Sequence, residues 1–260
     1  MQELTYETLP APPPLDRVVH CFWFLRGRGD GSVQTIVPDG RAEIVVHVGE
    51  PWASQESVVL SGQLTGPLAL RSSQQIDVVG IRLRPDAPHA LLGIAQDELT
   101  NAVVPLRVVA NRLARALEQA ARSAPTSDAR MRALSGPLAE LAPREPSPVA
   151  QAVARAAETL QTFDLHRMAR SLGVTTRTLE RRCRTEIGVP AGTLRRLVRF
   201  RRAYRRLERT PVGQWARIAV ASGYYDQAHM NRDFREFAGA SPSVFFGREP
   251  ELASAFLSDH

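Results

Sequence analysis

The chain has 260 residues, and its 33 basic residues are all arginine, against 27 acidic residues. This length predicts about two domains, each large enough to bury an apolar core. The two cysteines, Cys21 and Cys183, fall one in each half, which excludes a disulfide framework and a CxxC metal site and favours a reducing compartment. No stretch is long and apolar enough to span a bilayer. We therefore expect a cytoplasmic protein that does not act in a membrane.

The positive charge is concentrated in the second half of the chain. Residues 1–149 hold 14 arginines and 16 acids, a net charge of −2, whereas residues 150–260 hold 19 arginines and 11 acids, a net charge of +8. A basic half joined to a nearly neutral one favours capture of a polyanion such as nucleic acid. A membrane surface would also attract it, but the arginines are spread over several predicted helices and not along one amphipathic face.

The first half begins with short apolar runs, rich in Val and Ile, that are separated by turn residues. The turns are marked by Pro38-Asp39-Gly40 and Gly66-Pro67. Such runs predict strands, and their close succession favours an antiparallel sheet or a small barrel. The expected strands are residues 18–25, 43–48, 58–60 and 76–83.

After Pro85 the pattern changes to helix. Apolar residues at helical spacing predict one helix around 108–117 and another around 131–141, with a break at Gly136-Pro137. The proline-rich residues 143–148 are typical of a linker. The expected fold is α+β, with a β-rich domain over residues 1–146 that ends in helices and an all-α domain over residues 147–260.

The all-α half contains a repeated pattern. Met168–Gly173 is echoed by Ile218–Gly223, and in each copy a second helix follows the glycine. Thr175 and Asp226 stand where a side-chain oxygen caps a new helix. The pattern predicts two helix-turn-helix units, with a leading helix over 149–162 and a long connecting helix over 193–208.

Each second helix has an apolar stripe and an opposite polar face. The stripes are Leu179, Cys183 and Ile187 in the first copy, and Met230, Phe234 and Phe237 in the second. Two structural helix pairs would show the same stripes, but two copies in a basic segment favour DNA reading. A connecting helix of 16 residues spans about 24 Å, which suits two reading helices in major-groove segments about 34 Å apart.

The last hundred residues resemble the AraC/XylS family of bacterial transcription regulators. The motifs that carry this resemblance lie between about Val149 and Arg248 and are residues 178–182, 199–203, 223–229 and 234–242. More weakly, Trp23 and residues 37–40 and 80–85 resemble the sensor region of one branch of that family, a small cupin-like sheet followed by helices. The resemblance implies a transcription regulator of double-stranded DNA, with a homodimer and RNA polymerase as candidate partners.

The resemblance also implies which residues contact DNA. Arginine suits guanine, glutamine and asparagine suit adenine, and glutamate accepts from cytosine. For Arg181 and Arg232 the alternatives are a phosphate contact or a salt bridge to Glu186 or Glu236. The predicted DNA-binding residues are Thr176, Arg177, Glu180, Arg181, Gln227, Ala228, Asn231 and Arg232.

For a small-molecule effector, Trp23, His47 and Arg82 are the candidate binding residues, because aromatic and polar groups on a sheet can line a pocket. The histidines of the first half have no HxH or HxxxH spacing, so no metal or other cofactor is expected. Neither a catalytic triad nor a carboxylate pair stands out, and we expect no enzyme. The alternative is a cupin-like enzyme or a small-molecule carrier with a basic helical appendage.

Overall fold

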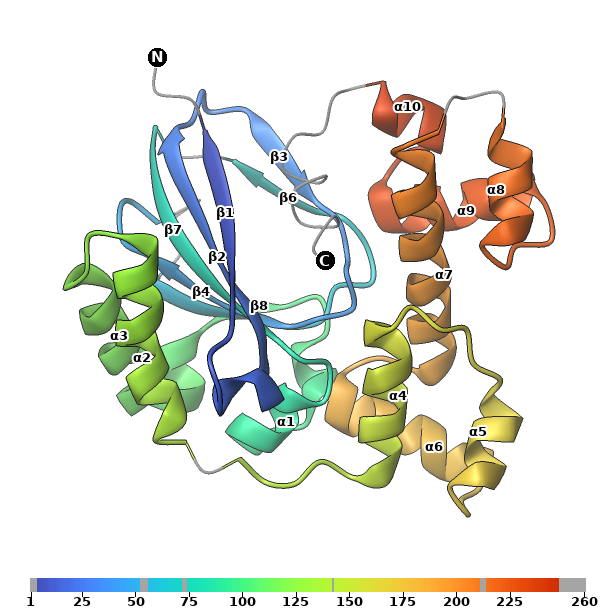
Figure 1. The fold of residues 1–260 in the computed structure, drawn as a ribbon, viewed down its shortest axis with the longest axis horizontal. Helices are drawn as coiled ribbons and strands as arrows, with labels where there is room; N and C mark the ends of the chain where they lie inside the picture. The colour runs from blue at the N-terminus through green and yellow to red at the C-terminus, as the bar shows by residue number, and fades with distance from the viewer. Residues whose placement is uncertain (1–3, 52–55, 72–73, 142, 211–213, 248–260) are drawn as a thin grey trace.

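The computed structural model describes residues 4–51, 56–71, 74–141, 143–210 and 214–247. A β-rich first part is followed by a helical second part, as the sequence predicts (Figure 1). The main sheet has six strands, and every neighbouring pair is antiparallel. In spatial order they are β1 (Thr5–Pro10), β2 (Val19–Arg28), β7 (Gln75–Leu83), β4 (Glu43–His47), β5 (Val58–Ser61) and β8 (Val103–Pro105).

The four predicted strands are confirmed as β2, β4, β5 and β7. Strands β1 and β8 were not predicted, nor was a separate two-stranded ribbon of β3 (Val33–Ile36) and β6 (Leu68–Arg71). The ribbon residues Ile36 and Leu70 pack with Trp23 on one face of the main sheet. Helices α2 (Leu106–Arg122) and α3 (Ser127–Ala139) cover the other face. Because both faces are covered, the central strands are apolar on both sides.

Helix α3 differs from the prediction, because it continues through Gly136-Pro137 and ends at Ala139. A proline inside a helix removes one backbone hydrogen bond. Only two helical residues follow Pro137, so this loss falls in the last turn and the helix tolerates it. After β7, the short helix α1 (Ala87–Leu92) and the 3-10 turn Gln96–Leu99 lead towards the helical part of the molecule.

The helical part contains the two predicted helix pairs. Its elements are α4 (Pro148–Glu158), α5 (Leu165–Ser171), α6 (Thr176–Arg182), a π-helical turn (Cys183–Ile187), α7 (Ala191–Leu207), α8 (Trp215–Ala221), α9 (Gln227–Ala238) and α10 (Pro242–Phe246). The leading helix α4 is shorter than predicted. Leu160 adopts a φ of 50°, and the Gln161 amide donates to the Ala156 carbonyl at 2.9 Å, which ends the helix.

Local sequence explains where the second helix of each pair, α6 or α9, begins. The Thr175 side chain accepts a hydrogen bond from the Thr178 amide, and the Asp226 side chain accepts one from the His229 amide. Both predicted caps are thereby confirmed. The turns before them use Gly173 and Gly223, whose φ angles of 65° and 94° lie in the left-handed region that favours glycine.

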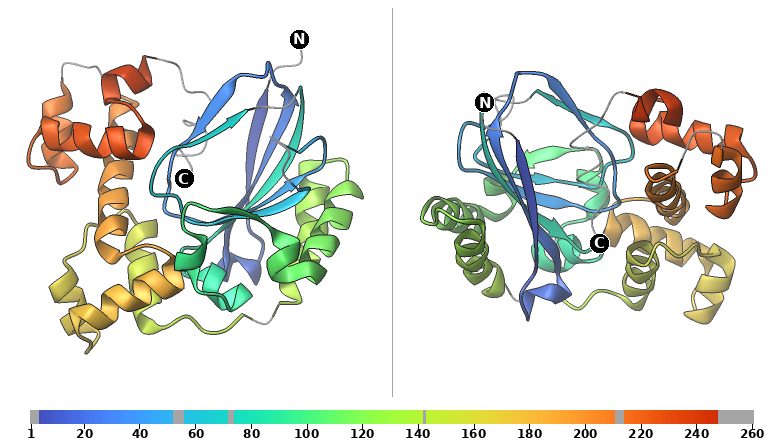
Figure 2. Two further views of the ribbon diagram at one scale, coloured as in Figure 1. Left: turned by 180° about the vertical axis from the view of Figure 1, so that it is seen from behind. Right: turned by 45° about the horizontal axis from the view of Figure 1, so that its top comes forward.

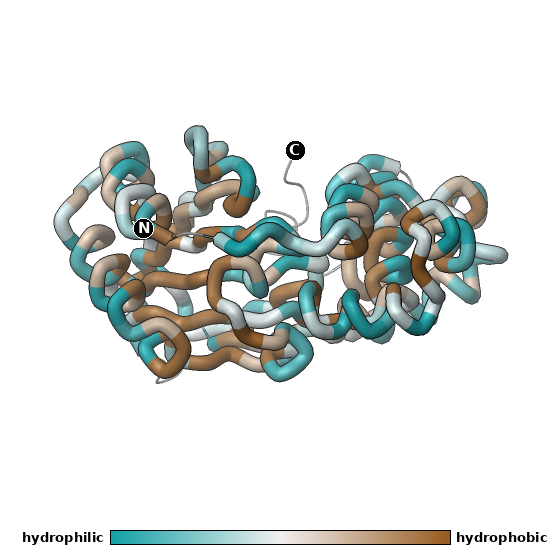
Figure 3. Tube along the Cα trace, turned by 90° about the horizontal axis from the view of Figure 1, so that it is seen from below, coloured by the Kyte–Doolittle hydropathy of each residue, from teal (hydrophilic) through white to brown (hydrophobic). Residues whose placement is uncertain are grey.

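The helical core is aromatic and is centred on α7. The Phe200 ring contacts Phe234 and Phe237 with centroid distances of 4.8 and 5.4 Å. The predicted stripes Leu179–Cys183–Ile187 and Met230–Phe234–Phe237 are all buried, as expected. Figure 3 shows the same pattern, with brown and teal alternating along the helices, while the strands are mostly brown.

The two parts pack against each other along their length (Figure 2). Arg84 at the end of β7 forms a 2.6 Å ion pair with Glu158 of α4. Val37, in the loop between β3 and β4, is buried in the core of the helical part. Thr100 donates a hydrogen bond to the Gly188 carbonyl after the π-helical turn. The helical part therefore sits on the sheet domain as a closely packed body.

Candidate nucleic-acid interface and ligand cavity

The first helix-turn-helix unit presents α6 with a free face. Arg177 and Arg181 are exposed, and Thr176 is half-buried with its hydroxyl 3.2 Å from His166 Nδ1. Glu186, one alternative partner of Arg181, is instead bound by Arg182 at 3.0 Å and by the Ser147 amide at 3.0 Å. Arg181 therefore keeps its guanidinium on the open face of α6.

Among the predicted DNA-binding residues of α6, Glu180 differs from the others because its side chain forms a hydrogen bond within the protein. Its Oε2 accepts a hydrogen bond from the Ala191 amide at 3.0 Å. Ala191 is the first residue of α7, where backbone amides lack a partner within the helix. Glu180 thus holds the start of the connecting helix, which sequence reasoning did not foresee.

The second unit presents α9 in the same way. Ala228 and Arg232 are exposed, and Gln227 and Asn231 are half-buried. Glu236, the alternative partner of Arg232, is bound by Arg196 at 2.5 Å. With the π-helical turn that continues it, α6 extends to Ile187, so both predicted sets of residues lie in the first half of their helices. The first half of a recognition helix is the part that enters the major groove.

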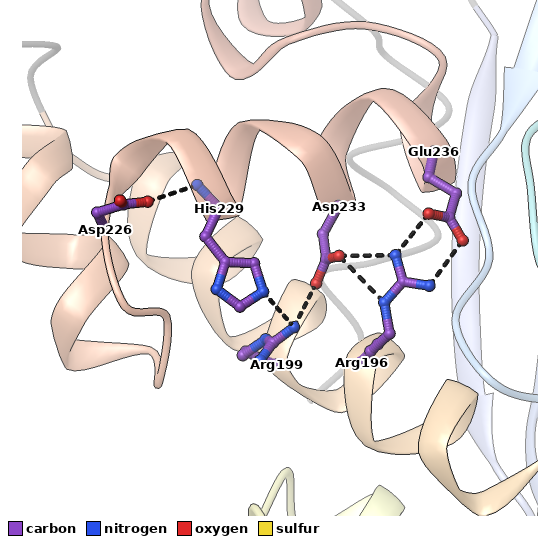
Figure 4. A network of polar contacts seen from close by, with 6 residues as sticks. All are labelled: Arg196, Arg199, Asp226, His229, Asp233 and Glu236. Carbon is purple, nitrogen blue, oxygen red and sulfur yellow. Dashed lines mark hydrogen bonds and ion pairs between the residues drawn. The ribbon is translucent and has the colours of Figure 1, made fainter.

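A polar network fixes α9 to α7 (Figure 4). The buried Asp233 carboxylate accepts hydrogen bonds from Arg196 at 2.8 Å and from Arg199 at 2.9 Å. Arg199 also lies 3.1 Å from His229 Nε2 and stacks on Tyr224, with its Cζ 4.3 Å from the ring centroid. His229 is therefore a packing residue of this network.

Helices α6 and α9 both begin on the outer side of the molecule and end against the sheet domain (Figures 1 and 2). The segment after α6 contacts α1 and the 3-10 turn Gln96–Leu99. After α9, a Cβ built on Gly239 would lie 3.4 Å from Pro67 Cγ. The units sit at opposite ends of α7, and this arrangement can offer two helix beginnings to one extended partner.

A surface groove lies between the two units. It was not predicted, because its residues come from three distant segments that no motif connects. Its walls come from α4, α5, α7 and the turn before α9, and the charged residues among them are Asp164, Arg167, Arg195 and Arg199. Asp164 caps α5, and Arg199 is held by Asp233. Arg167 and Arg195 are exposed and leave the groove positive.

The sheet domain contains a cavity of about 70 Å³ between the main sheet and the β3–β6 ribbon. Trp23, His47 and Arg82, the three residues predicted to line a pocket, all lie on its wall. Gly80 makes room for the Trp23 indole, because a Cβ there would fall 1.8 Å from the ring atom Cε2. Most of the remaining wall is apolar and is formed by Ile36, Val37, Pro38, Val45, Val59, Leu64, Leu68, Leu70 and Val103.

Buried charges gather at one end of this cavity. Arg82 binds Glu43 at 2.6 Å and lies 3.4 Å from Asp39, and Arg41 lies 3.5 Å from Asp39. Burial raises the pKa of Glu43, and Arg82 only partly opposes this. Burial would also raise the pKa of Asp39, but Arg82 and Arg41 outweigh it and keep that pKa low. Asp39 is therefore the firmly ionised carboxylate of the cluster.

Sequence reasoning missed two arginines of this cluster. Arg41 lines the cavity with its side chain 2% exposed, and Arg201 of α7 is buried next to it. Burial, and then the charge of Arg41, lower the pKa of Arg201. Arg201 lies in a basic helix, where the sequence pattern predicts a solvent-facing charge, so only the packing of the two parts reveals it.

Among the described residues, no helix has both the length and the apolar character of a membrane span. A search of curated proteins found no match to the chain. Among solved structures, ToxT from Vibrio cholerae is similar over 95% of this chain and 98% of its own, with 11% identity and a TM-score of 0.43. Wild-type ToxT from strain SCE256 with a bound unsaturated fatty acid covers 94% of both chains, with 12% identity and a TM-score of 0.41.

Two family models match the sequence. A domain of unknown function, DUF6597, matches residues 7–105, which form the strands and the cavity. A helix-turn-helix domain matches residues 168–248, which include both units and α7. This second match is of the AraC type and agrees with the paired units on either side of a connecting helix. The chain therefore carries a DUF6597 domain followed by an AraC-type helix-turn-helix domain, the DNA-binding domain of a transcription regulator.

Proposed function

We propose that this regulator reads two successive major-groove segments of promoter DNA, one with α6 and one with α9. The observation that carries the proposal is the shared orientation of these helices, whose beginnings face outward while their ends rest on the sheet domain. Helix α7, with 17 residues, separates the units by about 26 Å of helix. With the width of the reading helices added, this separation suits one turn of the duplex, about 34 Å.

The proposed base contacts are the exposed and half-buried residues on the open faces of α6 and α9. They are Thr176, Arg177 and Arg181 on α6, and Gln227, Ala228, Asn231 and Arg232 on α9. Of the DNA-binding residues predicted from the sequence, Glu180 is the least suited to contact a base, because one of its oxygens accepts a hydrogen bond from the Ala191 amide. Arg167 and Arg195, in the groove between the units, are suited to the phosphates that connect the two major-groove segments.

Binding to the promoter region of the chain's own gene, measured by fluorescence anisotropy, tests this reading. We expect specific binding roughly 10³-fold or more above that to bulk DNA. Inserting about half a helical turn between the two half-sites should abolish the advantage, because it moves one site to the opposite face of the duplex. If the insertion leaves affinity unchanged, only one unit reads DNA.

Two substitutions refine the test. Gln227→Ala and Asn231→Ala should each cost about 1 to 3 kcal/mol at a single base position. The matched control is Gln119→Ala on α2, in the sheet domain. A uniform loss on every sequence would instead identify Gln227 and Asn231 as phosphate contacts.

We also propose that the cavity of the sheet domain binds a small effector that controls DNA binding. In support, it brings Trp23, His47 and Arg82 together, and α7 contributes Arg201 to the charges beside it. Within this proposal the protein acts in the cytoplasm, where RNA polymerase meets it on the same promoter. A screen of small molecules for those that change both the unfolding temperature and the DNA affinity tests the effector role.

A further inference from the structure

The charged end of the cavity holds more buried cations than anions. Three guanidiniums, those of Arg41, Arg82 and Arg201, surround two carboxylates, Asp39 and Glu43. A guanidinium stays protonated in a protein. Even with both carboxylates ionised, these five buried side chains therefore carry one positive charge in excess.

Arg41 carries that excess at the cavity wall. Its Nε and Nη1 are buried and have no hydrogen-bond partner in the described ranges. Its nearest carboxylate, Asp39 at 3.5 Å, is beyond good hydrogen-bond distance and is shared with Arg82 at 3.4 Å. A buried charge whose hydrogen-bond donors are unsatisfied is costly, and the Nε and Nη1 of Arg41 can therefore donate to an anion.

Arg201 adds to the same imbalance from the helical part. Its Nε also lacks a partner within the described residues, and Arg41 and Arg82 both oppose its charge. His20 of β2 does not change this balance of charge. Its pKa is lowered to about 3 by burial and by Arg41 and Arg82, which keeps the ring neutral at physiological pH.

Resting on the effector role proposed above, we propose that the cavity binds a small organic monocarboxylate. Its carboxylate accepts hydrogen bonds from Arg41, and its apolar part lies between the main sheet and the β3–β6 ribbon. One negative charge balances the excess of one that remains when both carboxylates are ionised. At about 70 Å³ the cavity is roughly half the size of one of about 150 Å³ that holds benzene, which favours short aliphatic acids.

The experiment uses the full chain and pairs of isosteric probes. Thermal unfolding is followed with butyrate and isobutyrate, and with butyramide and isobutyramide, at matched ionic strength. The acids should raise the unfolding temperature and the amides should not, because only the acids neutralise Arg41. Arg41→Gln should weaken acid binding about 10- to 100-fold, the range for a charge-assisted hydrogen bond.

A second readout separates this role from a structural one. Without ligand, Arg41→Gln should unfold at the same or a higher temperature, because it removes a buried charge whose one carboxylate contact, Asp39 at 3.5 Å, is shared with Arg82. The matched control is Arg130→Gln. Arg130 is also buried but is paired with Asp77 and with two backbone carbonyls. This control should lower the unfolding temperature and keep the response to acids.

The outcomes separate this inference from the effector role itself. If amides stabilise the protein as well as acids do, the cavity takes a neutral effector and only the anion assignment fails. If acids still bind to Arg41→Gln with full affinity, their site is elsewhere and the inference is wrong. If neither series changes the unfolding temperature at millimolar concentration, the cavity does not bind short acids and this inference is wrong, while the wider screen for effectors still tests the effector role.

Discussion

Arg199 of α7 connects to Asp233 of α9 through a 2.9 Å hydrogen bond between its Nη2 and the carboxylate Oδ2. The same guanidinium stacks on Tyr224 in the turn that precedes α9. One side chain therefore contacts both the turn and the reading helix of the second unit. The orientation of α9 on α7 depends on this contact as well as on the aromatic core.

Asp233→Ala should lower the free energy of unfolding by about 2 to 3 kcal/mol. Asp233 is 2% exposed, and its loss leaves Arg196 and Arg199 without a buried counter-charge. Urea denaturation measures the change. The control Glu236→Gln should cost less than about 1 kcal/mol, because Glu236 is half-exposed in its pair with Arg196. Equal losses for both variants would contradict the prediction that the buried Asp233 contributes more to stability than Glu236.

Glu180→Ala should reduce stability by about 1 kcal/mol, because the Ala191 amide at the start of α7 loses its acceptor. Glu180→Gln keeps an acceptor oxygen and should restore most of the loss. The base preference of the protein, measured on a set of promoter variants, should stay unchanged. A changed preference at one base pair with unaltered stability would show that Glu180 reads DNA after all.

Arg195→Gln should weaken binding to all DNA sequences by a similar factor and lower the slope of log affinity against log salt by about 1. The reason is that Arg195 is exposed in the groove between the units, where a phosphate rather than a base edge is the expected partner. Arg132→Gln, on the exposed side of α3, serves as the control and should leave the slope unchanged. A loss confined to one sequence would exclude a phosphate contact.

His20 should make the protein less stable in mild acid. Burial, with Arg41 and Arg82, lowers its pKa from 6.5 to about 3, so the unfolded chain binds a proton between these values and the folded chain does not. The stability that His20 contributes is present above pH 6.5 and is lost as the pH falls towards 3. Full linkage would give about 1 kcal/mol of loss between pH 6.5 and 5.5, and because the ring is partly exposed we expect less than this.

Urea denaturation at several pH values measures this loss in the wild type and in His20→Gln, which should show a flatter profile. His166→Gln is the control, because His166 is exposed on α5. Identical pH profiles for the wild type and His20→Gln would rule out the assignment.

The elements predicted correctly are those with local signals. Thr175 and Asp226 have short side chains that cap the first turn of α6 and α9, and such caps can be recognised in the sequence. The apolar residues around Phe234 recur at helical spacing, which also identifies a helix with one buried face. Strands β1 and β3 were not predicted. They are short and partly exposed, and they form by pairing with β2 and β6, which lie elsewhere in the sequence.

The candidate sites divide in the same way. Trp23, His47 and Arg82 were predicted to line a pocket, and all three line the cavity. Arg41 and Arg201 were missed, because they come close together only when the sheet packs against α7. They are 160 residues apart in the sequence, and no local motif indicates such a contact. Glu180 was expected to face a base, and only the folded chain shows its contact with the Ala191 amide.

Val37 stands on a loop of the sheet domain, yet it is 2% exposed and belongs to the core of the helical part. Close beside it, a Cβ on Gly40 would lie 3.3 Å from Leu194 of α7. When sheet domains and helical parts of related regulators are exchanged, the contact between Val37 and the core of the helical part has to be preserved. A chimaera joined at the proline-rich segment would inherit a foreign residue at Val37, and a shortened protein without the sheet domain would leave a void that its own side chains cannot fill.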